Sequence, residues 1–457
     1  MIAALLLAAV AALVVAVAAC LRTPDWDYPR AFPDAPEQWH GITGAPAPLR
    51  CGLGTVLFWS LATAAAAAFV ALGLLLFPPQ AAFLMGLLGG FLLAVAVARR
   101  MLRWGPGAMR MRPREPKRPV GQRPRVLFIC GSPNQTTQMH QIARQLPEVE
   151  AWFASYYTDD WFYVLLFKLG LTESTIAGHR RRGVTFDYLN EHGLPIDLLG
   201  EHNEYDLYLS PNDQLVPPGM RGVPCILVQE GIQEPPNWRT RVWQYTRLMP
   251  KVLTGTATYG LSDQYVKFCL ASEGYRRRYL AAGIAPQKLE LTGVPNFDNF
   301  AQWRNNTFPH RGYVLVCTSD ARETLLSIDR MGLLRKAVQV AAGRQLIFKL
   351  HPNERVDRAI REIRSVAPPD ALIFTDGPAE EMVANCDVLF TEWSSLTFCG
   401  MAFGKEIHSL HPLSEVKEML PLQHGRAAQE IAEVVRKVLA ERVGRRFVTQ
   451  AKARKAS

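Results

Sequence analysis

The chain has 457 residues, of which 49% are hydrophobic and 20% charged, and its formal net charge is +10. These proportions exclude a disordered chain, a collagen-like repeat and a disulfide-rich scaffold, and the chain is too polar for a polytopic transporter. The positive charge indicates a nucleic acid, an anionic membrane or an anionic substrate as partner, and its position along the chain distinguishes these classes.

Three uncharged apolar segments occupy residues 2–21, 53–77 and 81–98. Because about 20 apolar residues cross a bilayer, they predict a transmembrane helix at 1–21, a loop at 22–52 and a transmembrane hairpin at 53–98. The first segment also fits a signal peptide, although no basic residue precedes its core. The hairpin also fits a re-entrant structure, because its second half is short.

A basic linker follows the hairpin and sets the predicted orientation. Residues 99–125 hold ten lysines and arginines against one acid, Glu115, which is +9 of the net +10. The positive-inside rule therefore places everything after residue 99 in the cytoplasm, on the inner face of the cell membrane, and counting back through the hairpin makes 22–52 a cytoplasmic loop. The stretch also suits anionic lipid headgroups. With the charge explained in this way, we expect no nucleic-acid partner.

From residue 125 onward the composition is that of an α/β protein. The first series of buried strand patterns lies at 126–130, 205–210, 224–229, 266–271 and 289–292. A second series lies at 312–317, 345–350, 371–374, 387–390 and 406–409, with helical patterns between the strands. The sequence predicts two doubly wound Rossmann-like domains, 125–298 and 299–441, followed by a basic tail at 442–457. Ligands of such sheets bind beyond the carboxyl ends of the strands, so we expect the site in the cleft between the domains.

Two motifs in the second domain suggest phosphate binding. Ser394 and Ser395 follow the strand at 387–390 and open a helix, where hydroxyl and N–H groups can hold a nucleotide diphosphate. An ordinary serine N-cap is the structural alternative. Lys349 and His351 stand at the end of the strand at 345–350, and both can donate hydrogen bonds to a phosphate oxygen.

Two first-domain residues are candidates for acid–base chemistry. Glu230 ends the strand at 224–229 and can act as a general base on an acceptor hydroxyl, or be a solvated or salt-bridged glutamate. His140, on the first helix of the domain, is the alternative base. The eight cysteines form no C-x-x-C pair and predict neither a zinc site nor a redox motif.

Three passages together resemble the two-domain glycosyltransferase fold called GT-B. They are the passage from Ser272 to Asp298, the Lys349–Pro352 motif, and Thr391–Ser395 followed by Gly404 and Lys405. The similarity is greatest to the branch of CDP-glycerol glycerophosphotransferases and capsule polysaccharide transferases, and it covers about residues 125–440. It implies that His351, Ser394 and Ser395 contact the donor phosphates, with neither a metal nor a further cofactor required.

The chain departs from that branch at two positions. Glu230-Gly231 stands where the glycerophosphotransferases carry His-Gly, and Cys399 stands where they tend to have an acid. Both departures favour a sugar nucleotide as donor. The expected function is that of a membrane-anchored glycosyltransferase with a lipid-linked or envelope polysaccharide acceptor. A CDP-glycerol-type glycerophosphotransferase, a UDP-sugar 2-epimerase-like enzyme and a non-catalytic membrane scaffold remain open.

Overall fold

The computed structural model describes residues 123–456 with the exception of 157–178 and of short stretches at 198–199, 201–202, 215–216, 218–221, 235, 237, 247–250, 263, 320–321, 323–327, 353 and 393. The predicted membrane segments, the loop at 22–52 and most of the basic linker lie outside these residues. No helix in the described part is long and apolar enough to cross a membrane.

Six parallel strands form the first sheet, in the order β2-β1-β3-β4-β5-β6. They are β1 (Arg125–Cys130), β2 (Glu150–Ser155), β3 (Leu207–Ser210), β4 (Cys225–Val228), β5 (Lys267–Leu270) and β6 (Leu289–Leu291). The sequence predicted five of them and missed β2. This strand is at the sheet edge, and only its second half is buried, so it lacks the continuous apolar run of a central strand.

Five parallel strands form the second sheet, in the order β11-β10-β7-β8-β9. They are β7 (Val314–Cys317), β8 (Leu346–Lys349), β9 (Leu372–Phe374), β10 (Val388–Thr391) and β11 (Glu406–Ser409). All five were predicted. The fold class, α/β with two doubly wound Rossmann-like units, is therefore confirmed for the part of the chain that the structure describes.

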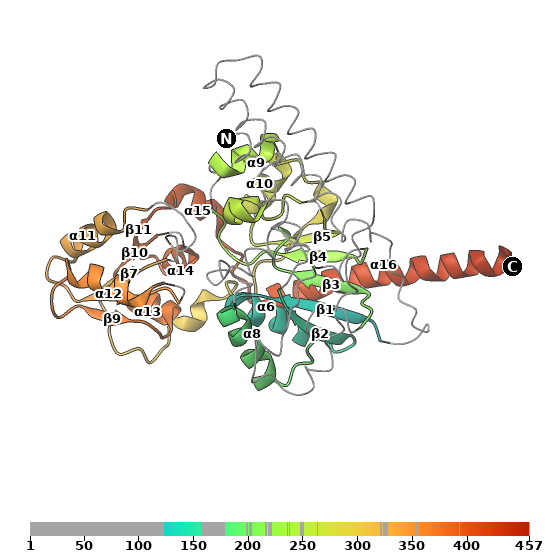
Figure 1. Ribbon diagram of the computed structural model, residues 1–457, viewed down its shortest axis with the longest axis horizontal. Coiled ribbons are helices and arrows are strands. Elements are labelled where there is room, and N and C mark those ends of the chain that lie inside the picture. The colour runs from blue at the N-terminus through green and yellow to red at the C-terminus, as the bar shows by residue number, and fades with distance from the viewer. Residues whose placement is uncertain are drawn as a thin grey trace, which may run out of the picture.

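Helices cover both faces of each sheet (Figure 1). The first unit carries α6 (Pro133–Arg144), α8 (His179–Glu191), α9 (Trp238–Thr246) and α10 (Glu273–Ala281). The second carries α11 (Arg330–Ala341), α12 (Val356–Arg364), α13 (Ala379–Asn385), α14 (Leu396–Ala402) and α15 (Leu413–Met419), and α16 (Ala427–Ala456) ends the described chain. Short 3₁₀ turns lie at Lys251–Thr258, Pro286–Lys288 and Phe300–Trp303.

Strand alternation divides the buried side chains between the two faces of each sheet. Along β7, Val314 and Val316 join the cluster under α11 and α12, whereas Leu315 and Cys317 point to the opposite face. That opposite cluster also contains Leu227 of β4, so one apolar core runs through both units. The two units are therefore joined by a common apolar core as well as by the chain itself.

The chain crosses between the units twice, and the crossings are bonded to each other. Asp298 leaves the first unit, and its Oδ2 accepts a hydrogen bond of 2.8 Å from the Ala427 N–H, at the start of α16. Gln423, on the returning segment, accepts from the Phe300 N–H at 3.0 Å. After this return α16 packs on the first sheet, where Ile431 and Val435 share a buried cluster with Phe128. The last helix of the predicted 299–441 domain thus completes the core of the first unit.

A second contact between the units joins α10 to α15. The Ser272 hydroxyl donates to the Glu418 carbonyl at 3.4 Å, and Arg277 pairs with the Glu418 carboxylate at 3.0 Å. A Cβ placed on Gly274 would stand 2.2 Å from the Glu418 carbonyl oxygen. Only glycine permits this approach of the two helices.

Gly274→Ala should therefore destabilise the protein by forcing α15 away from α10. Repacking costs of this kind are about 1–3 kcal/mol. Gly183→Ala, on α8, is the matched control, because a Cβ there meets nothing within 4 Å. Alanine should stabilise that helix by up to about 1 kcal/mol. Denaturant unfolding of both variants measures the difference, and equal stabilities would contradict the close contact.

Candidate functional site

The carboxyl ends of strands from both sheets converge at the junction between the units. From the first sheet come Ser132, after β1, and Glu230, after β4. From the second come Ser395, after β10, and His411, after β11. Since ligands of parallel sheets bind beyond these ends, this junction is the candidate site.

Glu230 is held by the start of α6. Its Oε1 accepts a hydrogen bond of 2.9 Å from the Ser132 hydroxyl, and its Oε2 accepts one from the Gln135 side-chain amide. Ser132 and Gln135 also cap α6 reciprocally: the Gln135 N–H donates to Ser132 Oγ, and the Ser132 N–H donates to Gln135 Oε1. The carboxylate thus has a fixed orientation close to a helix N-terminus, which favours its negative charge.

His140 lies elsewhere on α6. Its Nδ1 is 2.9 Å from the Tyr188 hydroxyl of α8, and its ring packs edge-on against Phe153 of β2. Burial, together with the charges of His192 and Arg144, lowers the pKa of His140, so the ring is neutral at pH 7. The structure brings Glu230, but not His140, to the junction between the units.

The serine pair at the start of α14 has two separate roles. Ser394 Oγ accepts from the N–H of Leu396, the first residue of α14, at 3.2 Å, whereas the N-cap residue itself, Ser395, makes no side-chain capping bond. Ser395 Oγ accepts from the Ile232 N–H of the first unit at 3.0 Å. A Cβ on Gly231 would stand 2.6 Å from Ser395 Oγ, so any larger residue there would displace this hydroxyl from its contact with the loop that carries Glu230. The serine loop and the Glu230 loop are therefore in direct contact.

Lys349 and His351 stand at the end of β8. Lys349 is buried, and its Nζ donates to the Leu350 carbonyl at 3.0 Å. His351 is partly exposed, and its N–H donates to Thr318 Oγ1 at 3.2 Å. Of the two predicted phosphate ligands, the His351 side chain is the more accessible.

A buried ion-pair network supports this edge of the second sheet, and the sequence did not reveal it. Arg330, which is 3% exposed, makes two bonds to the Glu392 carboxylate, of 2.6 and 3.0 Å. It also pairs with Glu354, which in turn accepts from the Thr318 hydroxyl. The Ser319 N–H donates to Glu392 at 2.9 Å. The network joins the loops after β7, β8 and β10, which carry His351 and the serine pair.

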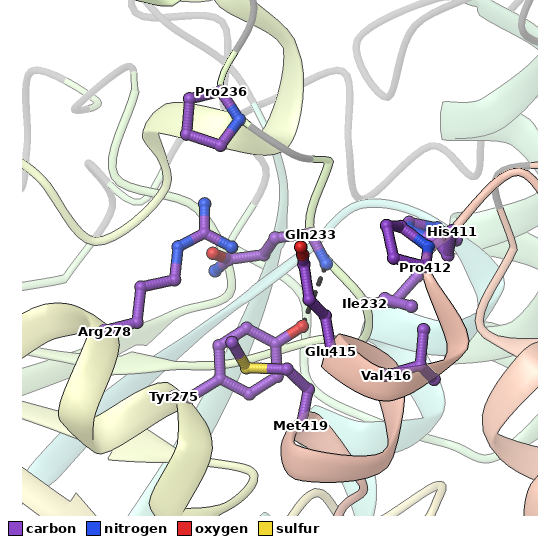
Figure 2. Close-up of a pocket in the computed structure, with 10 residues that line it drawn as sticks. All are labelled: Ile232, Gln233, Pro236, Tyr275, Arg278, His411, Pro412, Glu415, Val416 and Met419. Carbon is purple, nitrogen blue, oxygen red and sulfur yellow. Dashed lines mark hydrogen bonds between the residues drawn. The ribbon is translucent and has the colours of Figure 1, made fainter.

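A pocket of about 200 Å³ lies beside the contact between Ser395 and Ile232 (Figure 2). Both units line it: Ile232, Gln233, Pro236, Tyr275 and Arg278 from the first, and His411, Pro412, Glu415, Val416 and Met419 from the second. The Arg278 guanidinium and the Glu415 carboxylate both point toward its interior in Figure 2.

The polar groups of the pocket suit a ligand with several hydroxyls. Gln233 is 7% exposed, and its side-chain nitrogen donates to the Tyr279 hydroxyl, whereas its Oε1 has no hydrogen-bond partner in the described part. A buried acceptor of this kind costs free energy unless a donor reaches it. Burial lowers the pKa of His411 to about 4, so its imidazole is neutral at pH 7.

The cysteines that the structure describes are buried in both units. The six cysteines in the described ranges are all buried and unpaired, and burial raises the pKa of Cys386 to about 12. No group of three or more His, Cys, Asp or Glu side chains in these ranges could hold a metal ion.

Comparisons with known proteins show similarity in architecture only. The sequence matches no protein-family model and no curated protein. Among solved structures, it is similar to the Methanocaldococcus jannaschii UDP-GlcNAc 2-epimerase in complex with UDP-GlcNAc and UDP (13% identity, TM-score 0.43, 68% of this chain and 99% of that one). It is also similar to S. aureus MnaA with UDP (10% identity, TM-score 0.44, 69% of this chain and 97% of that one). A third similar structure is that of the wall teichoic acid polymerase TagF (10% identity, TM-score 0.39, 70% of this chain and 90% of that one).

Removing the guanidinium of Arg330 should strongly destabilise the second unit. Arg330→Ala leaves two buried carboxylates without their main cation, and breaking such a pair costs about 3–5 kcal/mol. Arg335→Ala removes an exposed arginine from the same helix and should change stability by about 0.5 kcal/mol or less. Unfolding followed by circular dichroism tests both variants, and similar midpoints would show that the network contributes little.

Protonation of His411 should oppose folding in acid. Its pKa is about 4 in the folded chain and about 6.5 when exposed. The unfolded chain therefore binds the extra proton first, and stability is lost as the pH falls from about 6.5 to 4. The loss attributable to this group is on the order of 3 kcal/mol. His411→Gln should have a shallower dependence of unfolding free energy on pH over this range, and an unchanged slope would exclude the effect.

Proposed function

We propose that the chain is a GT-B-type glycosyltransferase that moves a sugar from a nucleotide donor to an acceptor hydroxyl. The observation that carries this proposal is the contact of the Ser395 hydroxyl with the Gly231–Ile232 loop, next to Glu230. It puts a candidate donor-phosphate loop and a candidate base at one junction between two Rossmann-like units. The pocket at this junction has room for about one sugar ring.

The proposed chemistry is a displacement at the anomeric carbon. The acceptor oxygen forms the new bond to this carbon, the bond to the donor phosphate breaks, and the nucleoside diphosphate leaves with the electron pair. Glu230 takes the acceptor proton. His351 and the amides and hydroxyls of the Ser394–Ser395 loop stabilise the charge of the leaving diphosphate.

The acceptor in this proposal is lipid-linked or part of an envelope polysaccharide. The three apolar segments before residue 99 and the basic linker support it, because they would hold the two units on the cytoplasmic face of the membrane. An anchored enzyme meets a lipid-linked acceptor by diffusion in two dimensions, so the anchor raises the local acceptor concentration.

His351→Ala should weaken nucleotide binding about ten- to a hundred-fold, the worth of one charge-assisted hydrogen bond. His192→Ala removes an exposed histidine from the first unit and should leave the affinity unchanged. Calorimetric titration with nucleoside diphosphates, with a melting curve for each variant, makes the measurement. Unchanged affinity in folded His351→Ala would refute the donor-site assignment.

Glu230→Gln should retain donor binding and lose transfer, because an amide cannot accept the acceptor proton. The expected loss is about a hundredfold or more in rate. His140→Gln is the matched comparison and should retain transfer, since His140 packs against α8 and β2. Donor incorporation into extracted envelope lipids supplies the assay. Donor conversion without any acceptor would instead indicate an epimerase, and transfer that survives in Glu230→Gln would exclude Glu230 as the base.

A further inference from the structure

The outward face of α9 exposes large aromatic side chains, whereas the outward face of a surface helix is normally polar. Residues 238, 241, 242 and 245 recur at i, i+3, i+4 and i+7 and so share one face of the helix. Trp238 is 65% exposed and Tyr245 is 87% exposed, and Val242 and Arg241 are exposed beside them. Thr240 and Trp243 are buried on the other side. The helix therefore exposes two large aromatic side chains, which the described part of the chain leaves uncovered.

The segment that carries this face is basic. Residues 235–262 contain no aspartate or glutamate and four basic residues, Arg239, Arg241, Arg247 and Lys251. The Arg239 guanidinium lies 5.9 Å from the centre of the Trp238 ring. Tryptophan, tyrosine and arginine together are characteristic of helices at the boundary between lipid headgroups and acyl chains.

We propose that the face of α9 formed by Trp238, Arg241, Val242 and Tyr245 docks on an anionic lipid bilayer. The aromatic rings would enter the headgroup boundary, and the arginines would pair with lipid phosphates while their aliphatic stems remain in the apolar layer. A second copy of the chain fits this face less well, because a two-fold contact would bring together two faces that both carry positive charge.

Docking of α9 would bring the candidate site to the membrane surface. Pro236 lines the pocket between the units, and only one residue separates it from Trp238. Their Cα atoms are therefore no more than about 7 Å apart. In Figure 1 α9 lies at the top of the first unit and α8 at the bottom, so α9 sets a defined orientation of that unit against a bilayer. This inference concerns the surface alone and does not depend on the identity of the donor.

Quenching of tryptophan fluorescence by brominated lipids tests the proposal. The full chain is reconstituted in vesicles of phosphatidylcholine with or without phosphatidylglycerol, and acyl-chain bromine quenches tryptophans in contact with lipid. The chain has ten tryptophans, so Trp238→Phe identifies the contribution of Trp238 by difference. Trp152→Phe, on β2, is the matched control. We expect a quenched component in anionic vesicles that Trp238→Phe removes and Trp152→Phe leaves.

Variants that retain Trp238 test which interactions hold α9 on the bilayer. Arg241→Gln should lower the ratio of docked to undocked α9 about fivefold, the worth of one basic residue near an anionic surface. Tyr245→Ser should lower it as well, whereas Val184→Ser, at an exposed apolar site on α8, should not. All these variants should bind nucleotide with the affinity of the unmodified chain. Loss of membrane docking can therefore be distinguished from loss of the proposed nucleotide-dependent activity.

Three results would overturn the proposal. The first is equal quenching with and without Trp238. The second is equal quenching of Trp238 in neutral and anionic vesicles. The third is a change of oligomeric state in detergent on Tyr245→Ser, which would assign this face to a second copy of the chain.

Discussion

The hydrogen bond from the Ala427 N–H to Asp298 is the point on which the arrangement of the two units depends. One crossing segment leaves the first unit at Asp298, and the other returns to it at Ala427. Because the two crossings are bonded to each other, the units are held together at this place. With the crossings fixed, the carboxyl ends of the two sheets face each other, and α16 completes the core of the first unit.

Two glycines fix how closely the facing edges approach. Gly231 allows the Glu230 loop to reach Ser395, and Gly274 allows α10 to lie against the Glu418 carbonyl of α15. The pocket lies beside both contacts. The absence of a side chain at these two glycines therefore sets how closely the segments around the pocket approach each other. On the second unit the loops after β7, β8 and β10 are held by Arg330 and its two carboxylates. A preorganised edge of this kind suits a site that must hold a charged group without rearrangement.

Glu230 combines a structural and a proposed chemical role. Two hydrogen bonds from the start of α6 orient its carboxylate, and the same bonds tie the β4 loop to that helix. The proposed membrane face on α9 begins immediately beyond this loop. A single stretch of chain, residues 230–246, thus runs from the proposed base, past the pocket, to the proposed lipid surface.

Apolar runs and turn residues alone predicted ten of the eleven strands, the central ones because parallel strands in the middle of a sheet are buried on both faces and read as continuous apolar runs. They also placed Glu230, His351 and the serine pair at strand ends. The edge strand β2 was missed because its sequence, Glu150–Ser155, has no continuous apolar run, and no pattern showed that α16 returns to the first sheet. The Arg330 network, the pocket and the separation of His140 from Glu230 depend on contacts between residues tens or hundreds of positions apart. Local sequence patterns do not record such distances, so only the tertiary structure decided them.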